Sequence, residues 1–355
     1  MKVCRANRPA LVTLLACWMT ILAARSASQV GDPGQWVRVD PIHPLPKRDF
    51  RGAVVHDSKM WVLGGIARVA ERLVVYNDVW SSSDGRRWIE VTDSAEWPIR
   101  FSLSVVSFKG ELWVIGGTLG GVVTYGDEVN DIWRSADGVN WTLVTDAAPW
   151  ALRDGYAVTV HDNRIWVIGG LLTGGGALQN DVWWTDDGVD WTQATAATPW
   201  APRSSHYAFS FDDRLWIMGG FWANNIPPTN VWSSADGVLW DRVASTSPVH
   251  VTLAASAAFN GEMWILSGTS QHHPMLSPLA RRSANGVDWM TEELPWTPRV
   301  GHSSVVFDNK LWMLGWGDDV WFFTPRSRAD YWILYDRQVE PPKSGSHAIA
   351  NRENY

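Results

Sequence analysis

Five arginines occupy the same position in a repeated sequence unit, and they are the side chains best suited to bind an anion. Each lies thirteen residues before a tryptophan, and they are Arg48, Arg100, Arg153, Arg203 and Arg299. A guanidinium group binds a carboxylate through two parallel hydrogen bonds, so a ring of arginines could bind an acidic ligand. Alternatively, each arginine holds its own unit together through the aspartate of an Asn-Asp-Val-Trp motif or through loop carbonyls. Repetition in nearly every unit favours this structural role.

Three residues break the repeat and are further candidates for ligand binding. Trp222 and Trp316 follow an apolar strand at a place where most units have no aromatic residue, and His250 lies beside Val251, which replaces the arginine in the fifth unit. Loop histidines are usually solvated, and no carboxylate or further histidine is spaced to complete a metal site with His250. We therefore expect no metal and no cofactor.

Five carboxylates on the same loops are candidates for proton transfer: Asp49, Glu71, Asp127, Glu128 and Asp154. None has a diagnostic spacing, because a catalytic carboxylate pair is defined by its distance in space. Phosphate-binding loops, nucleophile elbows and zinc-protease motifs are absent from the sequence. Catalytic residues stay unassigned at this level, and we expect a binding protein rather than an enzyme.

The units that must position these residues recur every 48 to 53 residues. An apolar run of the type Leu-Trp-Val-Ile-Gly-Gly occurs six times, and its tryptophans are Trp61, Trp113, Trp166, Trp216, Trp264 and Trp312. A phrase of the type Ser-x-Asp-Gly-x-x-Trp follows in five units, with Trp88, Trp141, Trp191, Trp240 and Trp289. Each unit contains four short strands, in the fourth unit at residues 205–211, 215–218, 231–232 and 239–240, joined by Asn-Gly or Asp-Gly hairpin signals. This pattern predicts an all-β fold, a six-bladed β-propeller of four-stranded antiparallel blades over residues 29–325.

The ring is expected to close through an N-terminal strand. The last strand of the unit is missing from the sixth copy, whereas residues 32–39 match it and Trp36 lies 52 residues before Trp88. Such closure would remove the open sheet edges that invite aggregation. Residues 331–335 are a rival for the same place.

The topology of such a blade predicts where function lies. The A–B and C–D turns of a four-stranded meander share one end, and the B–C loops share the other with the connections between blades. The B–C loops vary in length, and variable loops on a rigid scaffold often carry function. The repeated tryptophans are expected in the core between blades, because each buries a large apolar area. We therefore expect the site at the B–C end of the central channel, where the arginines begin the innermost strands.

The double glycine after an apolar strand, the downstream tryptophan and the spacing together resemble the Kelch repeat of the galactose oxidase-like superfamily. The resemblance covers about Gln35 to Thr324. It departs in its third-strand tryptophan and in the Ser-x-Asp-Gly-x-x-Trp turn, which is similar to a shortened Asp-box of sialidase propellers. The superfamily includes oxidases, epimerases and binding scaffolds, so the resemblance implies the fold more than an activity. A copper radical oxidase needs a Tyr–Cys cross-link, and both cysteines, Cys4 and Cys17, lie in the expected signal peptide.

The chain is expected to be exported. A basic start, an apolar run at residues 10–24 and small residues at 26–28 are typical of a secretory signal peptide, residues 1–28. Anchoring as a lipoprotein at Cys17 is a minor alternative. Loss of this segment removes four of the 30 cations (Lys2, Arg5, Arg8, Arg25) and none of the 37 acids, which leaves a net charge of −11. So acidic a chain argues against nucleic acid or an anionic membrane as a partner. Residues 326–355 are polar and are expected to form a partly disordered C-terminal extension.

These observations predict a secreted or periplasmic monomer that acts as a binding scaffold for a glycan, an acidic ligand or a protein through its B–C loop face. The alternative is a propeller enzyme that acts on sugars (an epimerase, lyase or hydrolase) at the same channel mouth.

Overall fold

The computed structural model describes residues 34–120, 127–174, 176–221, 228–270, 276–315 and 319–325. Residues Trp36–Thr324 form one compact unit. The expected signal peptide, the extension at 326–355 and the rival closing segment at 331–335 lie outside the described residues. Within the described ranges, no helix is long and apolar enough to cross a membrane.

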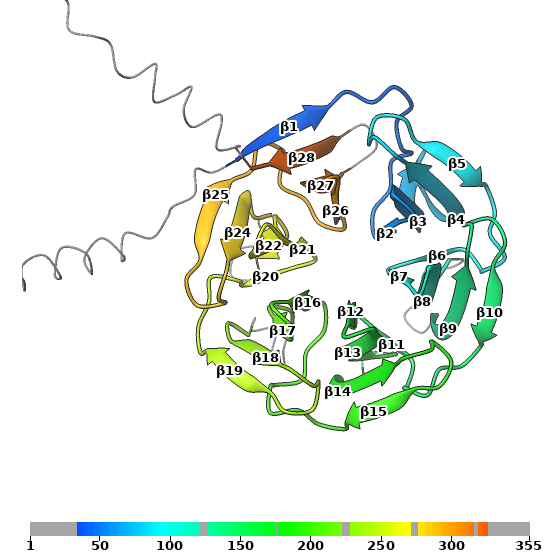
Figure 1. Cartoon of the computed structure of the whole chain (residues 1–355). Helices are drawn as coiled ribbons and strands as arrows, with labels where there is room; N and C mark the ends of the chain where they lie inside the picture. Colours follow the sequence, from blue (N-terminus) through cyan, green and yellow to red (C-terminus); the bar gives the residue numbers. More distant parts are fainter. Residues whose placement is uncertain are drawn as a thin grey trace, which may run out of the picture. The chain divides into compact units, whose positions relative to one another are not determined.

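The compact unit is the predicted six-bladed β-propeller (Figure 1). Each blade is a four-stranded antiparallel sheet whose first strand is innermost and whose last strand is outermost. Blade 1 contains β2 (Gly52–His56), β3 (Lys59–Val69), β4 (Arg72–Ser82) and β5 (Ile89–Thr92); blade 2 contains β7 (Ser104–Phe108), β8 (Glu111–Leu119), β9 (Glu128–Ser135) and β10 (Thr142–Thr145). Blade 3 contains β12 (Ala157–His161), β13 (Arg164–Leu172), β14 (Leu178–Thr185) and β15 (Thr192–Thr195); blade 4 contains β16 (Tyr207–Phe211), β17 (Arg214–Met218), β18 (Val231–Ser234) and β19 (Asp241–Ala244). Blade 5 contains β21 (Ala255–Phe259), β22 (Glu262–Leu266), β24 (Leu279–Ser283) and β25 (Met290–Glu293); blade 6 contains β26 (Ser303–Phe307), β27 (Lys310–Leu314), β28 (Val320–Thr324) and β1 (Gln35–Val39).

The N-terminal strand closes the ring, as predicted. Strand β1 pairs with β28 and completes the sheet of blade 6. Trp36 in this strand packs edge-on against Trp296, with ring centroids 4.6 Å apart, and against Trp264 of blade 5. Arg51 adds a second link between the first and last blades, because its guanidinium donates to the carbonyl oxygens of Leu314 and Gly315.

Tight hairpins join the first two strands of every blade. Both central residues of each turn have positive φ, as in Lys109-Gly110 and Asn260-Gly261, which is the type I′ geometry that matches strand twist. Asp162-Asn163 and Asp308-Asn309 adopt it without glycine. Asparagine and aspartate tolerate this region better than other non-glycine residues, so the hairpin chemistry predicted from the sequence is confirmed.

In blades 1 to 5 the last strand begins after its tryptophan, later in the chain than predicted. Leu239 and Trp240 were expected in this strand, but in blade 4 it begins at Asp241. The preceding residues are used by the turn: in blade 2 one Asp137 carboxylate oxygen accepts the backbone N–H groups of Val139 and Asn140, both at 2.8 Å. These bonds stabilise the carboxylate and lower the pKa of Asp137 to about 2.

Indole side chains fill the space between blades. The six tryptophans of the second strands are at most 6% exposed. In the turn before the last strand, glycine backbone lies against the indole of the preceding blade, so that a Cβ on Gly138 or Gly237 would overlap the ring of Trp61 or Trp166. In the described residues, five of the six blade boundaries therefore have a large ring on one side and a bare backbone on the other.

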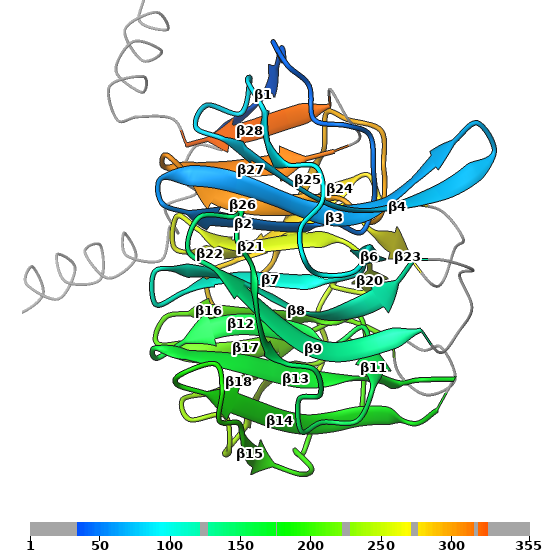
Figure 2. The same ribbon diagram turned by 90° about the vertical axis from the view of Figure 1, so that its right-hand side faces the viewer.

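The B–C connection of blade 1 is regular rather than irregular. Residues 66–76 were expected as a variable loop, but β3 and β4 continue as a paired hairpin with Val69 opposite Arg72. Figure 2 shows this hairpin projecting at the end of the propeller that carries β6 (Arg100–Phe101) and β11 (Arg153–Asp154).

Candidate functional site

Four of the five repeated arginines form ion pairs within their own blades. Arg100 donates to both oxygens of Asp131 at 2.6 and 2.8 Å, and Arg153 binds Asp181 at 2.5 and 3.0 Å. The corresponding pairs in blades 1 and 6 are Arg48 with Asp78 and Arg299 with Asp319. In each case the aspartate also accepts the indole N–H of the tryptophan two residues later. This Arg–Asp–Trp triad is the structural alternative considered from the sequence.

The fifth arginine lacks this partner. In blade 4 Asn230 stands in place of the aspartate, and its amide oxygen accepts a hydrogen bond from Arg203, at 2.8 Å. No described residue provides a hydrogen-bond partner for the buried indole nitrogen of Trp232. Burial lowers the pKa of Arg203 to about 9. Among the described residues, the buried cation of blade 4 therefore has hydrogen bonds to uncharged oxygens but no carboxylate counter-ion.

The residues two positions after the arginines form a belt around the channel mouth. The six equivalent positions all have positive φ, between 50° and 68°: Phe50, Ser102, Gly155, Ser205, Leu253 and Gly301. Four backbone hydrogen bonds link members of neighbouring blades: Phe50 to Gly301, Ser102 to Phe50, Ser205 to Gly155 and Gly301 to Leu253. At the two other junctions, between blades 2 and 3 and between blades 4 and 5, the described residues form no such bond. The amide of Gly155 donates instead to the carboxylate of Asp154, at 2.6 Å.

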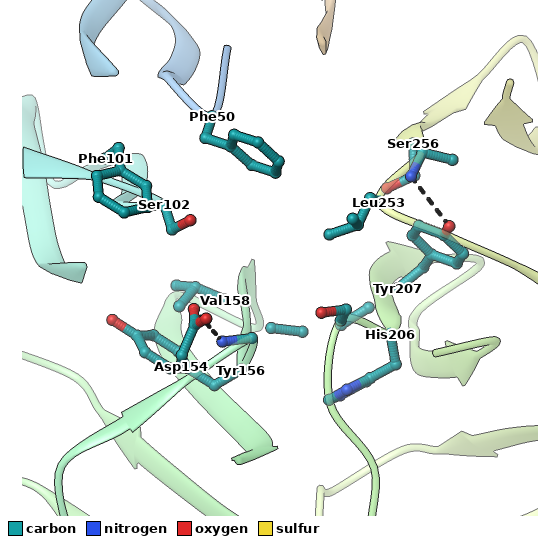
Figure 3. A pocket seen from close by; sticks show the side chains of 15 residues that line it. Phe50, Phe101, Ser102, Asp154, Tyr156, Val158, His206, Tyr207, Leu253 and Ser256 are labelled. Atoms are coloured by element: carbon teal, nitrogen blue, oxygen red, sulfur yellow. Dashed lines mark hydrogen bonds between the residues drawn. The ribbon is translucent and has the colours of Figure 1, made fainter. Parts of the chain in front are cut away.

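A cavity of about 500 Å³ lies within this belt and draws its lining from five blades. Figure 3 shows its lining residues, which include Phe50, Phe101, Ser102, Asp154 and Leu253. A second cavity of about 710 Å³, at the base of the β3–β4 hairpin, belongs to blade 1 and its entry segment alone and is lined by Arg48 and Asp49 among others. We take the channel cavity as the candidate site because ligand sites usually occur where several elements converge.

The two sides of the channel cavity differ in chemistry. Phe50, Phe101 and Leu253 supply apolar side chains from blades 1, 2 and 5. Ser102, Asp154 and Ser205 supply two hydroxyl groups and a carboxylate from blades 2, 3 and 4. The cavity can therefore hold a group that is apolar on one face and able to donate hydrogen bonds from the other.

Asp154 is the ionisable group of this cavity that is best placed for chemistry. Its side chain reaches solvent at the channel mouth and is otherwise surrounded by protein, so loss of hydration raises its pKa. The negative charge of Glu128 raises the pKa further, whereas the hydrogen bond from Gly155 lowers it. Glu128 is 9% exposed, and one of its oxygens has no hydrogen-bond partner among the described residues. The charge of Glu128 therefore acts on Asp154 across the boundary between blades 2 and 3.

The deeper wall of the cavity contains buried neutral groups. His206 lies three residues after Arg203, and burial together with the charge of Arg203 lowers its pKa to about 3. Tyr207 accepts the amide of Ala254 and donates to the carbonyl of Val251, and burial raises its pKa above its ordinary value. Neither side chain titrates at neutral pH. They act as fixed parts of the wall.

Of the residues predicted from sequence, the arginines and His250 do not line the channel cavity. The five arginines lie behind the belt, and His250 is half-buried next to β20 (Val251–Thr252). Trp222 and Trp316 are outside the described residues. Of the five candidate carboxylates, Asp154 lines the channel cavity, whereas Glu71 is exposed at the tip of the β3–β4 hairpin. No group of three metal-ligating side chains occurs in the described part of the chain.

Four lining residues were not predicted from the sequence: Phe50, Ser102, Ser205 and Leu253. The repeat itself carried the signal that could have found them, since every one lies two residues after the arginine position. Their residue types do not indicate a left-handed backbone, so the belt was not anticipated.

Comparison with known proteins supports the fold alone. No protein-family model matches the chain, and no curated protein matches it. The solved structure of YjhT is similar, with a TM-score of 0.63 at 13% sequence identity, over 81% of this chain and 97% of that chain. Because 579 chains of solved structures match, the fold is widespread and does not by itself indicate an activity.

Proposed function

We propose that this chain is an extracytoplasmic, Kelch-like binding module that holds a saccharide in the channel cavity at its B–C end. The observation that carries the proposal is the division of the cavity into an apolar side (Phe50, Phe101, Leu253) and a polar side (Ser102, Asp154). A sugar ring has C–H faces that pack on aromatic rings and hydroxyl groups that donate to a carboxylate. The signal-peptide pattern of residues 1–28 supports export.

An acidic ligand receives less support than a neutral one. The guanidinium groups of Arg48, Arg100 and Arg153 are occupied by carboxylates of their own blades. The charge at the cavity itself is the carboxylate of Asp154, which repels an anion. A protein partner remains an alternative for the outer loops.

The test is binding of a panel of neutral mono- and disaccharides, measured by saturation-transfer NMR. Asp154→Asn keeps the shape and the acceptor for Gly155 but removes the charge. Because a hydrogen bond to a charged group contributes about 1.5–3 kcal/mol, the variant should bind about 10-fold or more weakly. Asp146→Asn, an exposed aspartate outside the cavity, is the matched control and should bind like the wild type. Equal binding by Asp154→Asn would refute the assignment of the site.

A second candidate function is an enzyme that transfers protons on a bound sugar. The raised pKa of Asp154 and its coupling to Glu128 favour it, because a general acid needs a pKa closer to neutrality than that of a free carboxylate. The same NMR samples decide between the two. A new sugar species that accumulates with the wild type but not with Asp154→Asn indicates an enzyme, whereas binding with unchanged sugar spectra indicates a binding module.

A further inference from the structure

Two members of the channel belt carry bulky side chains on a left-handed backbone. Phe50 has a φ of 51° and Leu253 a φ of 55°. The other members are serine or glycine, namely Ser102, Gly155, Ser205 and Gly301. A non-glycine residue in this region is uncommon, and a bulky one is an outlier that costs free energy.

The fold does not require bulk at these positions. The same turn, with the same sign of φ, is formed in four other blades by residues with a small side chain or none. The belt hydrogen bonds of Phe50 and Leu253 use backbone atoms only, so any residue could form them. A smaller residue would thus adopt the same positive φ at a lower cost in conformational free energy.

Both bulky side chains face the cavity. Figure 3 shows Phe50 and Leu253 directed toward its open centre from two sides. Both residues are half-buried rather than packed in the core. The ring of Phe50 lies beside the bare backbone of Gly301, where a Cβ would come within 3.3 Å of it. The ring is therefore held at the mouth and still presents apolar surface to the channel.

We propose that Phe50 and Leu253 form a pair of apolar lips that bind the apolar part of a ligand and determine specificity, and that their backbone strain is retained for this purpose. Strained conformations that persist in a fold concentrate at functional sites, where the surrounding structure maintains them. Only the identification of the ligand as a sugar rests on the proposed function. The lips themselves would select any small hydroxylated molecule with an apolar face.

The experiment uses Phe50→Gly and Leu253→Gly in the full chain. Glycine removes both the side chain and the strain, since it populates positive φ freely. Ser58→Gly and Asn260→Gly are matched controls, because they relax the same backbone conformation in hairpin turns that do not line the cavity. Phe259→Ala, in the buried core of blade 5, shows what loss of a structural phenylalanine does. The measurements are the Tm by calorimetry and the Kd of benzyl alcohol, an aromatic probe with one hydroxyl group, by NMR titration.

The proposal expects two results together. The Tm of both lip variants should equal or exceed that of the wild type, whereas Phe259→Ala should melt clearly lower. The Kd of benzyl alcohol should rise about threefold to tenfold in the lip variants, because a ring or branched-chain contact is lost, and should stay unchanged in Ser58→Gly and Asn260→Gly.

Three results would overturn it. One is a fall in Tm as large as that of Phe259→Ala, which would make the side chains structural. Another is unchanged affinity of the lip variants for benzyl alcohol, and the third is no binding of this probe by the wild type. Failure of the proposed function looks different: the wild type would then bind benzyl alcohol through the lips but none of the saccharides in the panel.

Discussion

Replacement of Asn230 by aspartate should stabilise the propeller by completing the triad of blade 4. In blade 3 the carboxylate of Asp181 accepts two bonds from Arg153 and a third from the indole of Trp183, at 2.9 Å. In blade 4, within the described part of the chain, the amide of Asn230 accepts one bond and the buried indole nitrogen of Trp232 has no partner. An aspartate can accept from both groups in the geometry that the other blades already use.

The expected gain follows from three contributions. A buried N–H without a partner costs about 1–3 kcal/mol, and a hydrogen bond to a charged group contributes about 1.5–3 kcal/mol. Against these stands the loss of hydration of the new carboxylate, which is several kcal/mol for an isolated ion but is offset here by a cation that is already buried. Arg203 is fully buried, and burial lowers its pKa to about 9, as expected of a cation without a counter-ion. We expect a net gain of about 2 kcal/mol.

The assay is urea unfolding followed by tryptophan fluorescence, in which a gain in stability appears as a higher midpoint at unchanged m. In calorimetry the same gain corresponds to a rise in Tm of about 4 °C for a domain of this size. Asn180→Asp in blade 3 is the matched control, and it should lower the urea midpoint. The amide nitrogen of Asn180 donates to the carbonyls of Thr198 and Trp200, at 2.9 and 3.1 Å, which a carboxylate cannot do.

An unchanged or lower midpoint for Asn230→Asp would refute the reasoning. It would mean that the hydration lost by the carboxylate outweighs the bonds it gains, and that the triads of the other blades specify the position of the arginine without stabilising the fold.

Three further predictions concern the buried histidine, the blade boundaries and the ring closure. His206 keeps a pKa of about 3 when folded against an ordinary 6.5, so the unfolded chain alone binds a proton between these values and the free energy of unfolding falls by about 1.4 kcal/mol per pH unit as the pH is lowered. His302 is buried with a pKa of about 3 as well and makes its own contribution to this slope. His206→Gln should therefore reduce the pH dependence of the urea midpoint in that window without abolishing it, and an equally steep variant would contradict the assignment. Gly237→Ala should lower the free energy of unfolding by about 1–3 kcal/mol more than Gly261→Ala. Both glycines have similar positive φ, but only the Cβ added at position 237 would overlap a ring, that of Trp166. Equal losses of stability in urea unfolding would show that only backbone strain contributes. Deletion of residues 29–39 should abolish the cooperative calorimetric transition because it removes the outer strand of blade 6, and a variant that melts like the full chain would reject closure by β1.

The sequence predicted the architecture well because each copy of the repeat corresponds to one blade. Six copies of the Trp-Gly-Gly run indicated six sheets, and the match around Trp36 indicated the closing strand. The order of strands in each blade followed from the hairpin signals between them. The last strand was placed too early because its tryptophan looks like a strand residue, although its backbone belongs to the preceding turn.

The candidate site was predicted less well, because it depends on backbone conformation and on contacts between blades, which residue types alone do not indicate. The arginines were conspicuous because they repeat, and that repetition reflects a structural triad in four blades. The cavity is lined instead by their neighbours, whose side chains differ from blade to blade. Positive φ could not be predicted at Phe50 and Leu253, because it is expected mainly at glycine and asparagine. The coupling of Asp154 to Glu128 depends on a contact between blades 2 and 3 that spacing along the chain does not reveal.

The unequal belt of backbone hydrogen bonds has a consequence for how the blades are joined. Blades 5, 6, 1 and 2 are joined in one continuous arc of belt bonds, and blades 3 and 4 are joined as a pair, whereas the described residues form no belt bond at the two junctions that flank this pair. Tyrosine side chains bridge these two junctions instead: the hydroxyl of Tyr156 donates to Ile115 of blade 2, and the hydroxyl of Tyr207 donates to Val251 of blade 5. The belt contact at these two junctions therefore depends on the identity of one side chain, whereas at the other four it is made by backbone atoms.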